Sequence, residues 1–465
     1  MKVSRRFSRL WVFPLVCLPT INLRQEGSLW LKQRTAAGNT IPLFNVLYDH
    51  QSTIRVVLVR EEARAGVMAD VYGRLTGKPG VAIGQAAFLV HASLGAIEAH
   101  VSSSPTLLLT DLSDQGVFSH HGPYQAGTGE YGTWDARQTF PAITKETLVA
   151  TTPVQAVQQT QLARKHALTG ERGPVAVLYH SQSLGGGVGP NSMASLYATD
   201  VYLPDPQPPA DTTLVEQAAR LLLEAQRPVI IAGNVVRISQ AFTELSTIAE
   251  ALGIPVATTA AGKSTFAETH DLAIGVFGNF GAPLANAVIA DADVLLVIGS
   301  KLAPTDTAFE TPKLLDPSLQ TIIQIDIEPK NASWTYPAEV ALIGDAKTTL
   351  TQLPEALTSA NRVTAEDIAQ RKASLQTARK KHGFFTASEL FSNAAPALPQ
   401  RVIQEVHKIN DPNATVTCDA GENRLFMMHY FQTKAPNTFI QPAGVGGMGY
   451  AIPAALAAKL ISPDR

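Results

Sequence analysis

Short apolar runs alternate with longer segments rich in small residues along the first part of the chain. Each run has the length of a buried strand, and the segments between the runs have the length of helices. This alternation is typical of an α/β domain built on a doubly wound parallel sheet. The expected strands are Val56–Val59, Val81–Gly84, Thr106–Thr110 and Val175–Tyr179.

The same alternation returns after a proline-rich stretch, Leu203–Pro209, which predicts a stiff and extended linker. No Gly-x-Gly-x-x-Gly motif follows the first strand of this second segment, so the sequence does not support a dinucleotide-binding domain or a dehydrogenase. The segment still predicts a Rossmann-like domain, with the helix Phe242–Leu252 and the strands Pro228–Gly233, Ile254–Ala257, Ala292–Gly299 and Thr321–Ile327.

A charged stretch at about 355–395 indicates a solvated connecting helix better than a binding patch. A third segment begins near Leu398 and contains the expected strand Ala414–Cys418 and the expected helix Ile452–Leu460. These patterns divide the chain into a first domain, a central domain, a helical connector and a partial third domain, at 38–195, 210–355, 356–397 and 398–465.

Composition agrees with this division, because 465 residues suffice for about three domains. The net charge of −2 gives no reason to expect a nucleic-acid or membrane partner. The two cysteines, Cys17 and Cys418, have no metal-binding or redox spacing, which favours a reducing compartment; we expect a cytoplasmic protein.

The N-terminus is unusual. Four basic residues lie within residues 1–10, and the apolar stretch Trp11–Leu18 that follows is too short to span a bilayer. No small-x-small cleavage site comes after it. We therefore interpret residues 1–37 as an atypical leader.

A carboxylate pair, Glu61 and Glu62, follows the first strand and begins a segment that predicts a helix ending at Gly77. A carboxylate held there, against the small residues of an apolar helix, is a candidate for proton chemistry. It could equally be a first-turn carboxylate that only matches the helix dipole.

The order of residues from Glu62 to Gly80 resembles the thiamine-diphosphate enzymes of the acetolactate synthase type. In that family a Glu starts a helix that continues as Ala-Asp-x-Tyr-x-Arg-x-Thr-Gly-Lys-Pro-Gly. The resemblance implies that Glu62, not Glu61, hydrogen-bonds a ring nitrogen of the cofactor's aminopyrimidine and activates it. It also implies three doubly wound parallel-sheet domains of the α/β class: pyrimidine-binding, Rossmann-like central and partial diphosphate-binding.

A glycine-dense turn at 444–449 resembles the family's Gly-x-Gly-x-Met-Gly-x-x-x-Pro motif. The resemblance implies that Gly447 and Met448 position the cofactor ring, although a methionine beside a helix is more often core packing. Gly421 and Glu422 match the family's turn at the diphosphate end, where backbone N–H groups suit a phosphate.

Two departures from the family stand out. The Gly-Asp-Gly motif that binds Mg²⁺ in the family is absent, so we expect the ligands of this metal beyond Arg465 and interpret the chain as a fragment. Where relatives have Gly-Pro-Gly-x-x-Asn, this chain has Ala86–His91, and Phe88 predicts a different substrate pocket. Some family members carry FAD in the central domain, but the residues here do not support FAD binding.

Two adjacent histidines, His120 and His121, lie in a glycine-rich stretch. Paired histidines in an analogous loop of the related 2-oxoacid decarboxylases handle protons, and imidazole titrates in the useful range. Exposed loop histidines without a role are the alternative.

The resemblance implies an acetolactate synthase-like enzyme that decarboxylates pyruvate or another small 2-oxoacid and transfers the acyl group to a second carbonyl. A 2-oxoacid decarboxylase and a catalytically inactive fragment or pseudo-subunit are the alternatives. In the family the active site lies between subunits, so we expect a homodimer or homotetramer.

Overall fold

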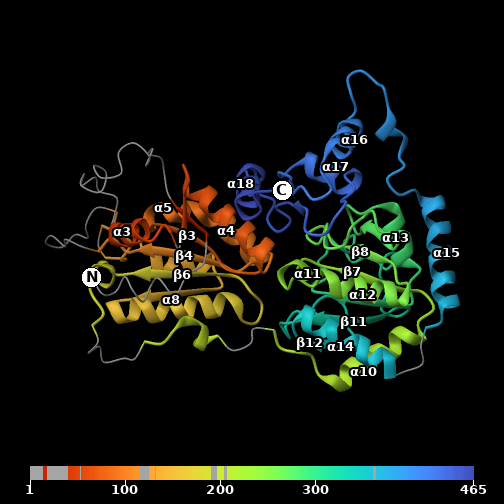
Figure 1. Ribbon diagram of the computed structural model, residues 1–465, viewed down its shortest axis with the longest axis horizontal. Coiled ribbons are helices and arrows are strands. Elements are labelled where there is room, and N and C mark those ends of the chain that lie inside the picture. The colour runs from red at the N-terminus through yellow and green to blue at the C-terminus, as the bar shows by residue number, and fades with distance from the viewer. Residues whose placement is uncertain are drawn as a thin grey trace. The chain divides into compact units, whose positions relative to one another are not determined.

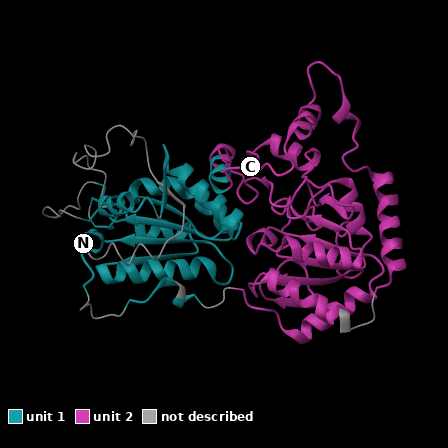
Figure 2. Cartoon of the chain, in the orientation of Figure 1, with its two compact units in different colours: residues 1–206, 456–461 teal, residues 207–455, 462–465 magenta. Residues whose placement is uncertain are grey.

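The computed structural model of the chain divides into two compact units, each described here by itself (Figures 1 and 2). Unit 1 comprises residues 1–206 and 456–461, and unit 2 comprises residues 207–455 and 462–465. The structure describes residues 14–17, 40–52, 54–114, 125–130, 132–189, 196–203, 207–359 and 363–465.

Unit 1 is built on a six-stranded parallel sheet with the strand order β2-β1-β3-β4-β6-β5. The strands expected from the apolar runs are all present, so the prediction of an α/β parallel-sheet domain is confirmed. The bounds are β1 (Pro14–Cys17), β2 (Arg55–Leu58), β3 (Gly80–Gln85), β4 (Thr106–Asp111), β5 (Glu146–Ala150) and β6 (Pro174–Tyr179).

Strand β1 comes from the segment that we interpreted as an atypical leader. Pro14–Cys17 pairs in parallel with both β2 and β3. Without this strand, the backbone N–H and C=O groups between β2 and β3 would have no partners inside the sheet. Part of residues 1–37 therefore completes the sheet.

Helices cover both faces of this sheet, with α4 on one side and α8 on the other (Figure 1). One face packs Val81, Ile83, Leu107 and Leu109 of the strands against α3 and α8. The helices are α3 (Ile41–Asp49), α4 (Glu62–Thr76), α5 (Ala86–Leu89), α6 (Ser93–Val101), α7 (Ala136–Thr139), α8 (Pro153–Leu168) and α9 (Ser181–Gly185), with short 3₁₀ turns η1 (Val90–Ala92), η2 (Phe140–Ala142) and η3 (Thr199–Tyr202).

Helix α4 ends as predicted at Gly77, whose φ of 67° is left-handed and favours glycine. It packs on α6 without intervening side chains: a Cβ on Gly95 would lie 2.1 Å from the carbonyl carbon of Gly66. A buried ion network fixes the same pair of helices. Arg74 donates to Asp70 at 3.0 Å and to Glu98 at 2.8 Å, and all three side chains are buried.

Unit 2 contains a second six-stranded parallel sheet, with the order β12-β11-β10-β7-β8-β9. Counted from its own first strand, this is the order 3-2-1-4-5-6 of a Rossmann-type sheet. The Rossmann-like prediction for the central domain is therefore confirmed. The strands are β7 (Pro228–Ala232), β8 (Val256–Thr258), β9 (Ala273–Val276), β10 (Val294–Ile298), β11 (Thr321–Asp326) and β12 (Val340–Ile343).

The helices of this part of unit 2 bury one large apolar core against the sheet. Helix α15 lies beside α13 (Figure 1) and is mostly exposed, as expected for a connecting helix. The helices are α10 (Thr212–Glu224), α11 (Val235–Ile238), α12 (Phe242–Leu252), α13 (Pro283–Ala290), α14 (Ala346–Ser359) and α15 (Ala365–His382), followed by the 3₁₀ turn η4 (Ser388–Phe391).

The C-terminal part begins with α16 (Pro399–Ile409) and contains a two-stranded parallel sheet, β13 (Val416–Thr417) and β14 (Phe439–Ile440), with α17 (Glu422–Tyr430) between the strands. The last helix is α18 (Ala451–Ile461). The buried Lys263 and Glu268 tie the central domain to this part, because Lys263 donates to Glu268 and to the carbonyl of Met428.

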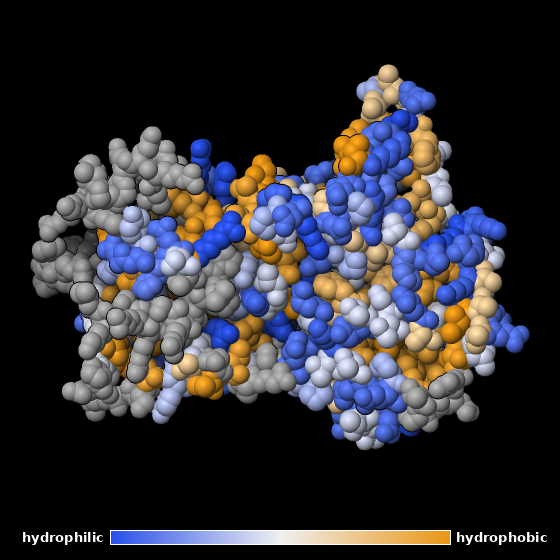
Figure 3. Space-filling model, in the orientation of Figure 1, coloured by the Kyte–Doolittle hydropathy of each residue, from blue (hydrophilic) through white to orange (hydrophobic). Residues whose placement is uncertain are grey.

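No helix among the described residues is long and apolar enough to cross a membrane. On the face shown in Figure 3, hydrophilic residues are interspersed with smaller hydrophobic areas, as is usual for a protein surface.

Candidate functional site

Glu62 occupies the first helical position of α4, in the segment that follows the end of β2 at Leu58. Its side chain is 8% exposed, whereas the neighbouring Glu61 is exposed and pairs with Arg64. The carboxylate of Glu62 makes no hydrogen bond or ion pair with any other described residue. A buried carboxylate without a protein partner is free to accept a hydrogen bond from a bound group.

Polar side chains that the sequence analysis missed lie at the carboxyl ends of the next strands. Gln85, the last residue of β3, donates to Ser113 and to Gln125, both at 2.9 Å. Ser113 in turn donates through its backbone N–H and its hydroxyl to Asp111, the last residue of β4, at 3.0 and 2.8 Å. The carboxyl ends of parallel strands meet at one edge of the sheet, which is where such folds bind ligands.

A histidine and a carboxylate form a pair at the same edge, after β6. Nδ1 of His180 lies 2.5 Å from Oδ2 of Asp114, and the N–H of Ser181 donates to Oδ1 at 2.7 Å. Burial alone would raise the pKa of Asp114, but the hydrogen bonds from Ser181 and His180 outweigh burial and lower it. Asp114 is therefore a carboxylate that orients a histidine.

The two turns that the sequence analysis assigned to the cofactor lie next to each other in unit 2. Asp419, after β13, accepts hydrogen bonds from the backbone N–H of Gly449 at 2.9 Å and of Ala451 at 3.1 Å. The structure therefore brings Gly421 and Glu422 near the turn that contains Gly447 and Met448. Burial opposes ionisation of Asp419, but hydrogen bonds from Ala451, Ala420, Gly449 and Tyr450 lower its pKa.

The conformations of these turns leave backbone and side chain open to a ligand. Gly421 and Gly449 have φ values of 94° and 83°, which favour glycine, and a Cβ on Gly449 would meet nothing within 4 Å. Met448 is 84% exposed, so within this chain it does not pack in the core. His120 and His121 lie outside the described residues.

The crevice of the central sheet, between the carboxyl ends of β7 and β10, is the place where Rossmann-type sheets bind dinucleotides. A Cβ on Gly299 would lie 2.1 Å from Cβ of Val235, and a Cβ on Gly233 would lie 2.2 Å from the carbonyl oxygen of Gly299. The two glycines therefore let the turns after β7 and β10 pack closely against each other.

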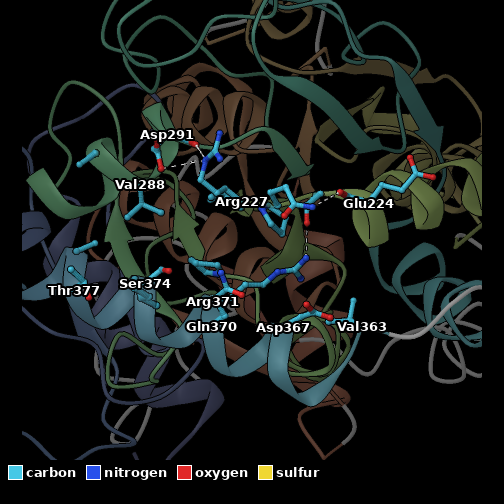
Figure 4. A pocket seen from close by; sticks show the side chains of 18 of the residues that line it. Glu224, Arg227, Val288, Asp291, Val363, Asp367, Gln370, Arg371, Ser374 and Thr377 are labelled. Atoms are coloured by element: carbon cyan, nitrogen blue, oxygen red, sulfur yellow. Dashed lines mark hydrogen bonds and ion pairs between the residues drawn. The ribbon is translucent and has the colours of Figure 1, made fainter.

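A cavity of about 1090 Å³ lies at the opposite edge of this sheet, between α10, α13 and α15 (Figure 4). Two of the arginines that line it, Arg227 and Arg371, have protein partners. Arg227 forms an ion pair with Asp291 at 3.3 Å, and Arg371 donates to the carbonyls of Leu252 and Ala225. None of the predicted site residues lines this cavity.

Comparison with known proteins matches three parts of the chain to domain models of one family. Residues 35–128 match the N-terminal TPP binding domain, residues 215–353 the central domain and residues 419–465 the C-terminal TPP binding domain of thiamine pyrophosphate enzymes.

Full-length relatives agree. The chain is 29% identical over 433 residues to a probable acetolactate synthase large subunit of Methanocaldococcus jannaschii, covering 92% of this chain and 70% of the relative. It is 30% identical over 436 residues to the acetolactate synthase large subunit of Corynebacterium glutamicum, covering 92% and 66%. It is 31% identical over 426 residues to a probable 2-ketoarginine decarboxylase of Pseudomonas aeruginosa, covering 89% and 69%.

The fold and the three matched domains define a class of α/β enzymes that bind an organic cofactor. The chain belongs to the family of thiamine pyrophosphate enzymes. The residues present fit this cofactor, because Glu62 offers a buried acceptor and the turn at Gly447 and Met448 is open. Among the described residues, no group of three or more His, Cys, Asp or Glu side chains is arranged to hold a metal ion.

Proposed function

We propose that the chain binds thiamine diphosphate and acts on a small 2-oxoacid such as pyruvate, as an acetolactate synthase-like enzyme that breaks and forms carbon–carbon bonds. The single observation that carries this proposal is Glu62, a buried carboxylate at the start of α4 without a partner among the described residues. The names of the relatives support the same class of substrate.

When bound, thiamine diphosphate supplies a carbon nucleophile and accepts the electrons released as carbon dioxide leaves. Glu62 would accept a hydrogen bond from a ring nitrogen of the aminopyrimidine, and this hydrogen bond would activate the cofactor. The close packing of α4 on α6 keeps this carboxylate in place, because neither helix can shift without breaking the network of Arg74.

The turns in unit 2 hold the cofactor in this proposal. Gly421 and Glu422 face its diphosphate end, and Gly447 and Met448 support its rings. Mg²⁺ would accompany the diphosphate. The oligomer with an active site between subunits, the proton-carrying role of His120 and His121, the domain limits given above and a cytoplasmic location remain predictions.

A 2-oxoacid decarboxylase is the second candidate. It is favoured by the likeness to a probable 2-ketoarginine decarboxylase and by the presence of an oriented histidine, His180, at the edge of the first sheet. In a decarboxylase the carbon that carbon dioxide has left receives a proton. In a synthase the same carbon bonds to a second carbonyl compound.

The test compares Glu62→Gln with its neighbour Glu61→Gln. Each variant and the parent chain are titrated calorimetrically with thiamine diphosphate and Mg²⁺, and the consumption of pyruvate and its products are followed. We expect Glu62→Gln to lower turnover about 100-fold or more, since proton-handling groups contribute that much, and Glu61→Gln to leave it unchanged. Equal effects of the two substitutions, or no binding of the cofactor by the parent chain, would refute the proposal.

A further inference from the structure

The pair of Asp114 and His180 is fixed from several sides. Strand β6 ends at Tyr179, and the backbone N–H of His180 then donates to the carbonyl of Ala150 at 2.9 Å. The hydroxyl of Ser183 donates to the carbonyl of His180 at 2.6 Å. Asp114 holds the ring at Nδ1 and the N–H of Ser181 at the same time. Both the backbone and the ring of His180 therefore have one orientation.

This orientation decides where the ring can exchange a proton. A carboxylate 2.5 Å from Nδ1 requires a hydrogen on that nitrogen, so only Nε2 of His180 gains or loses a proton. Among the described residues, none forms a hydrogen bond with Nε2. The side chains of His180 and Asp114 are 27% and 19% exposed, so a small molecule can reach them. A carboxylate that holds a histidine in one tautomer is the arrangement that enzymes use for general acid–base catalysis.

The same edge of the sheet carries a buried polar atom without a partner among the described residues. Oε1 of Gln85 makes no hydrogen bond with any of them, although Gln85 is only 4% exposed. Buried polar atoms are nearly always paired, and an unpaired one calls for a water, an ion or a ligand. This atom at the carboxyl edge of the sheet therefore favours a polar molecule there.

We propose that His180, oriented by Asp114, contacts the carbonyl oxygen of the 2-oxoacid and protonates it when the carbonyl carbon is attacked. This inference rests on the proposed function and names a group that the family resemblance did not supply. His180 acts in its imidazolium form, with a hydrogen on both ring nitrogens. As the cofactor's carbon nucleophile would bond to the carbonyl carbon, the electron pair of the C=O π bond moves to oxygen, an O–H bond forms, and the Nε2–H bond breaks. The neutral imidazole then regains a proton from the solvent. His180 is the catalytic residue of the step, and Asp114 is a positioning residue.

The alternative is structural, since Asp114 also holds the backbone N–H that begins α9. A purely structural pair would change stability when mutated but would not sense a substrate. The experiment must therefore report on the ring of His180 directly, and not only on turnover.

The full chain is labelled with [¹³Cε1, ¹⁵N]-histidine, and its ring signals are followed by NMR while pyruvate is added without thiamine diphosphate. The signal of His180 is assigned by its loss in His180→Asn. We expect pyruvate to shift this signal, and Asp114→Asn to change the ¹⁵N shifts toward a mixture of tautomers. His100→Asn, which removes an exposed histidine at the end of α6, is the matched control and should leave the signal of His180 unchanged.

Turnover of the loaded enzyme is then measured on the same variants. We expect His180→Asn to lower kcat about 100-fold or more, Asp114→Asn about 10-fold or more, and His100→Asn not at all. If the NMR signal of His180 does not change when pyruvate is added, the inference is wrong, whatever the turnover. Normal turnover of His180→Asn together with the loss of turnover in Glu62→Gln overturns it while the proposed function stands. A pyruvate-dependent signal in a chain without turnover supports the inference and counts against the proposed function alone.

Discussion

The buried ion pair of Lys263 and Glu268 offers a sharp test of how the central domain is tied to the C-terminal part. Both side chains are almost completely inaccessible, with exposures of 0% and 2%. Nζ of Lys263 donates to both carboxylate oxygens of Glu268 at 2.7 Å, and the backbone N–H of Thr433 donates to the same carboxylate at 2.8 Å. Glu268→Gln keeps the shape of the side chain and removes its charge.

The size of the effect follows from what the substitution leaves behind. Lys263 would retain a hydrogen bond to the carbonyl of Met428, but no carboxylate would neutralise its ammonium group. Breaking a buried ion pair by removing one partner costs about 3–5 kcal/mol. Burial already lowers the pKa of Lys263, so part of the loss should be relieved by deprotonation above neutral pH. We therefore expect Glu268→Gln to be less destabilising at pH 9 than at pH 6.

The assay is urea unfolding followed by circular dichroism, at both pH values. Glu250→Gln is the control. Glu250 pairs with His270, but the side chain of Glu250 is 59% exposed, so this pair should contribute less than about 1 kcal/mol to stability. The double variant Lys263→Met, Glu268→Leu should be more stable than Glu268→Gln, since it leaves no buried charge. A loss below about 1 kcal/mol, or a double variant as unstable as the single one, would refute this reasoning.

Three further predictions concern packing, a thiol and a turn. Gly95→Ala should destabilise the protein by about 1–3 kcal/mol in urea unfolding, because the added Cβ would collide with the backbone of α4. This is opposite to the gain that alanine usually brings in a helix. Gly185→Ala is the control, because a Cβ there would meet open space. In a Cys17→Ser background, Cys418 should react with a thiol reagent at pH 8 only as fast as the protein unfolds, because burial raises its pKa to about 11; rapid reaction of the folded protein would contradict this. Asp419→Asn should weaken binding of thiamine diphosphate in calorimetry. It should also reduce stability, because the lowered pKa of the Asp419 carboxyl stabilises the folded protein above about pH 4. This contribution is lost as the pH falls further. An unchanged stability difference between Asp419→Asn and the parent from pH 6 to pH 3 would argue against that role.

The sequence predicted the parts of the fold that local patterns determine. The strands β3, β4 and β6 are continuous apolar runs because both of their faces are covered by helices. Helix α4 was predicted with its start at Glu62 and its stop at Gly77 because a first-turn carboxylate and a left-handed glycine mark helix ends. Patterns of this kind are readable without knowing the tertiary structure.

Other features depend on contacts between distant segments. Strands β9 and β12 have only four residues each, too few for a periodic pattern to identify. The partners of Asp114 lie 66 and 67 residues away along the chain, so only the sheet brings them together. One signal was available: His180 directly follows a predicted buried strand, and polar residues at that position deserve consideration as site residues in any parallel sheet.

The buried network of Asp70, Arg74 and Glu98 changes how the most recognisable stretch of this chain should be weighed in sequence searches. Two of these residues belong to the stretch from Glu62 to Gly80, yet they have no access to a ligand and serve to join two helices. Selection for folding alone would preserve them in a descendant that had lost all activity. Catalytic and inactive members of such a lineage should therefore share Asp70 and Arg74. They should be told apart at Glu62, because a buried carboxylate without a partner among the described residues brings folding no advantage.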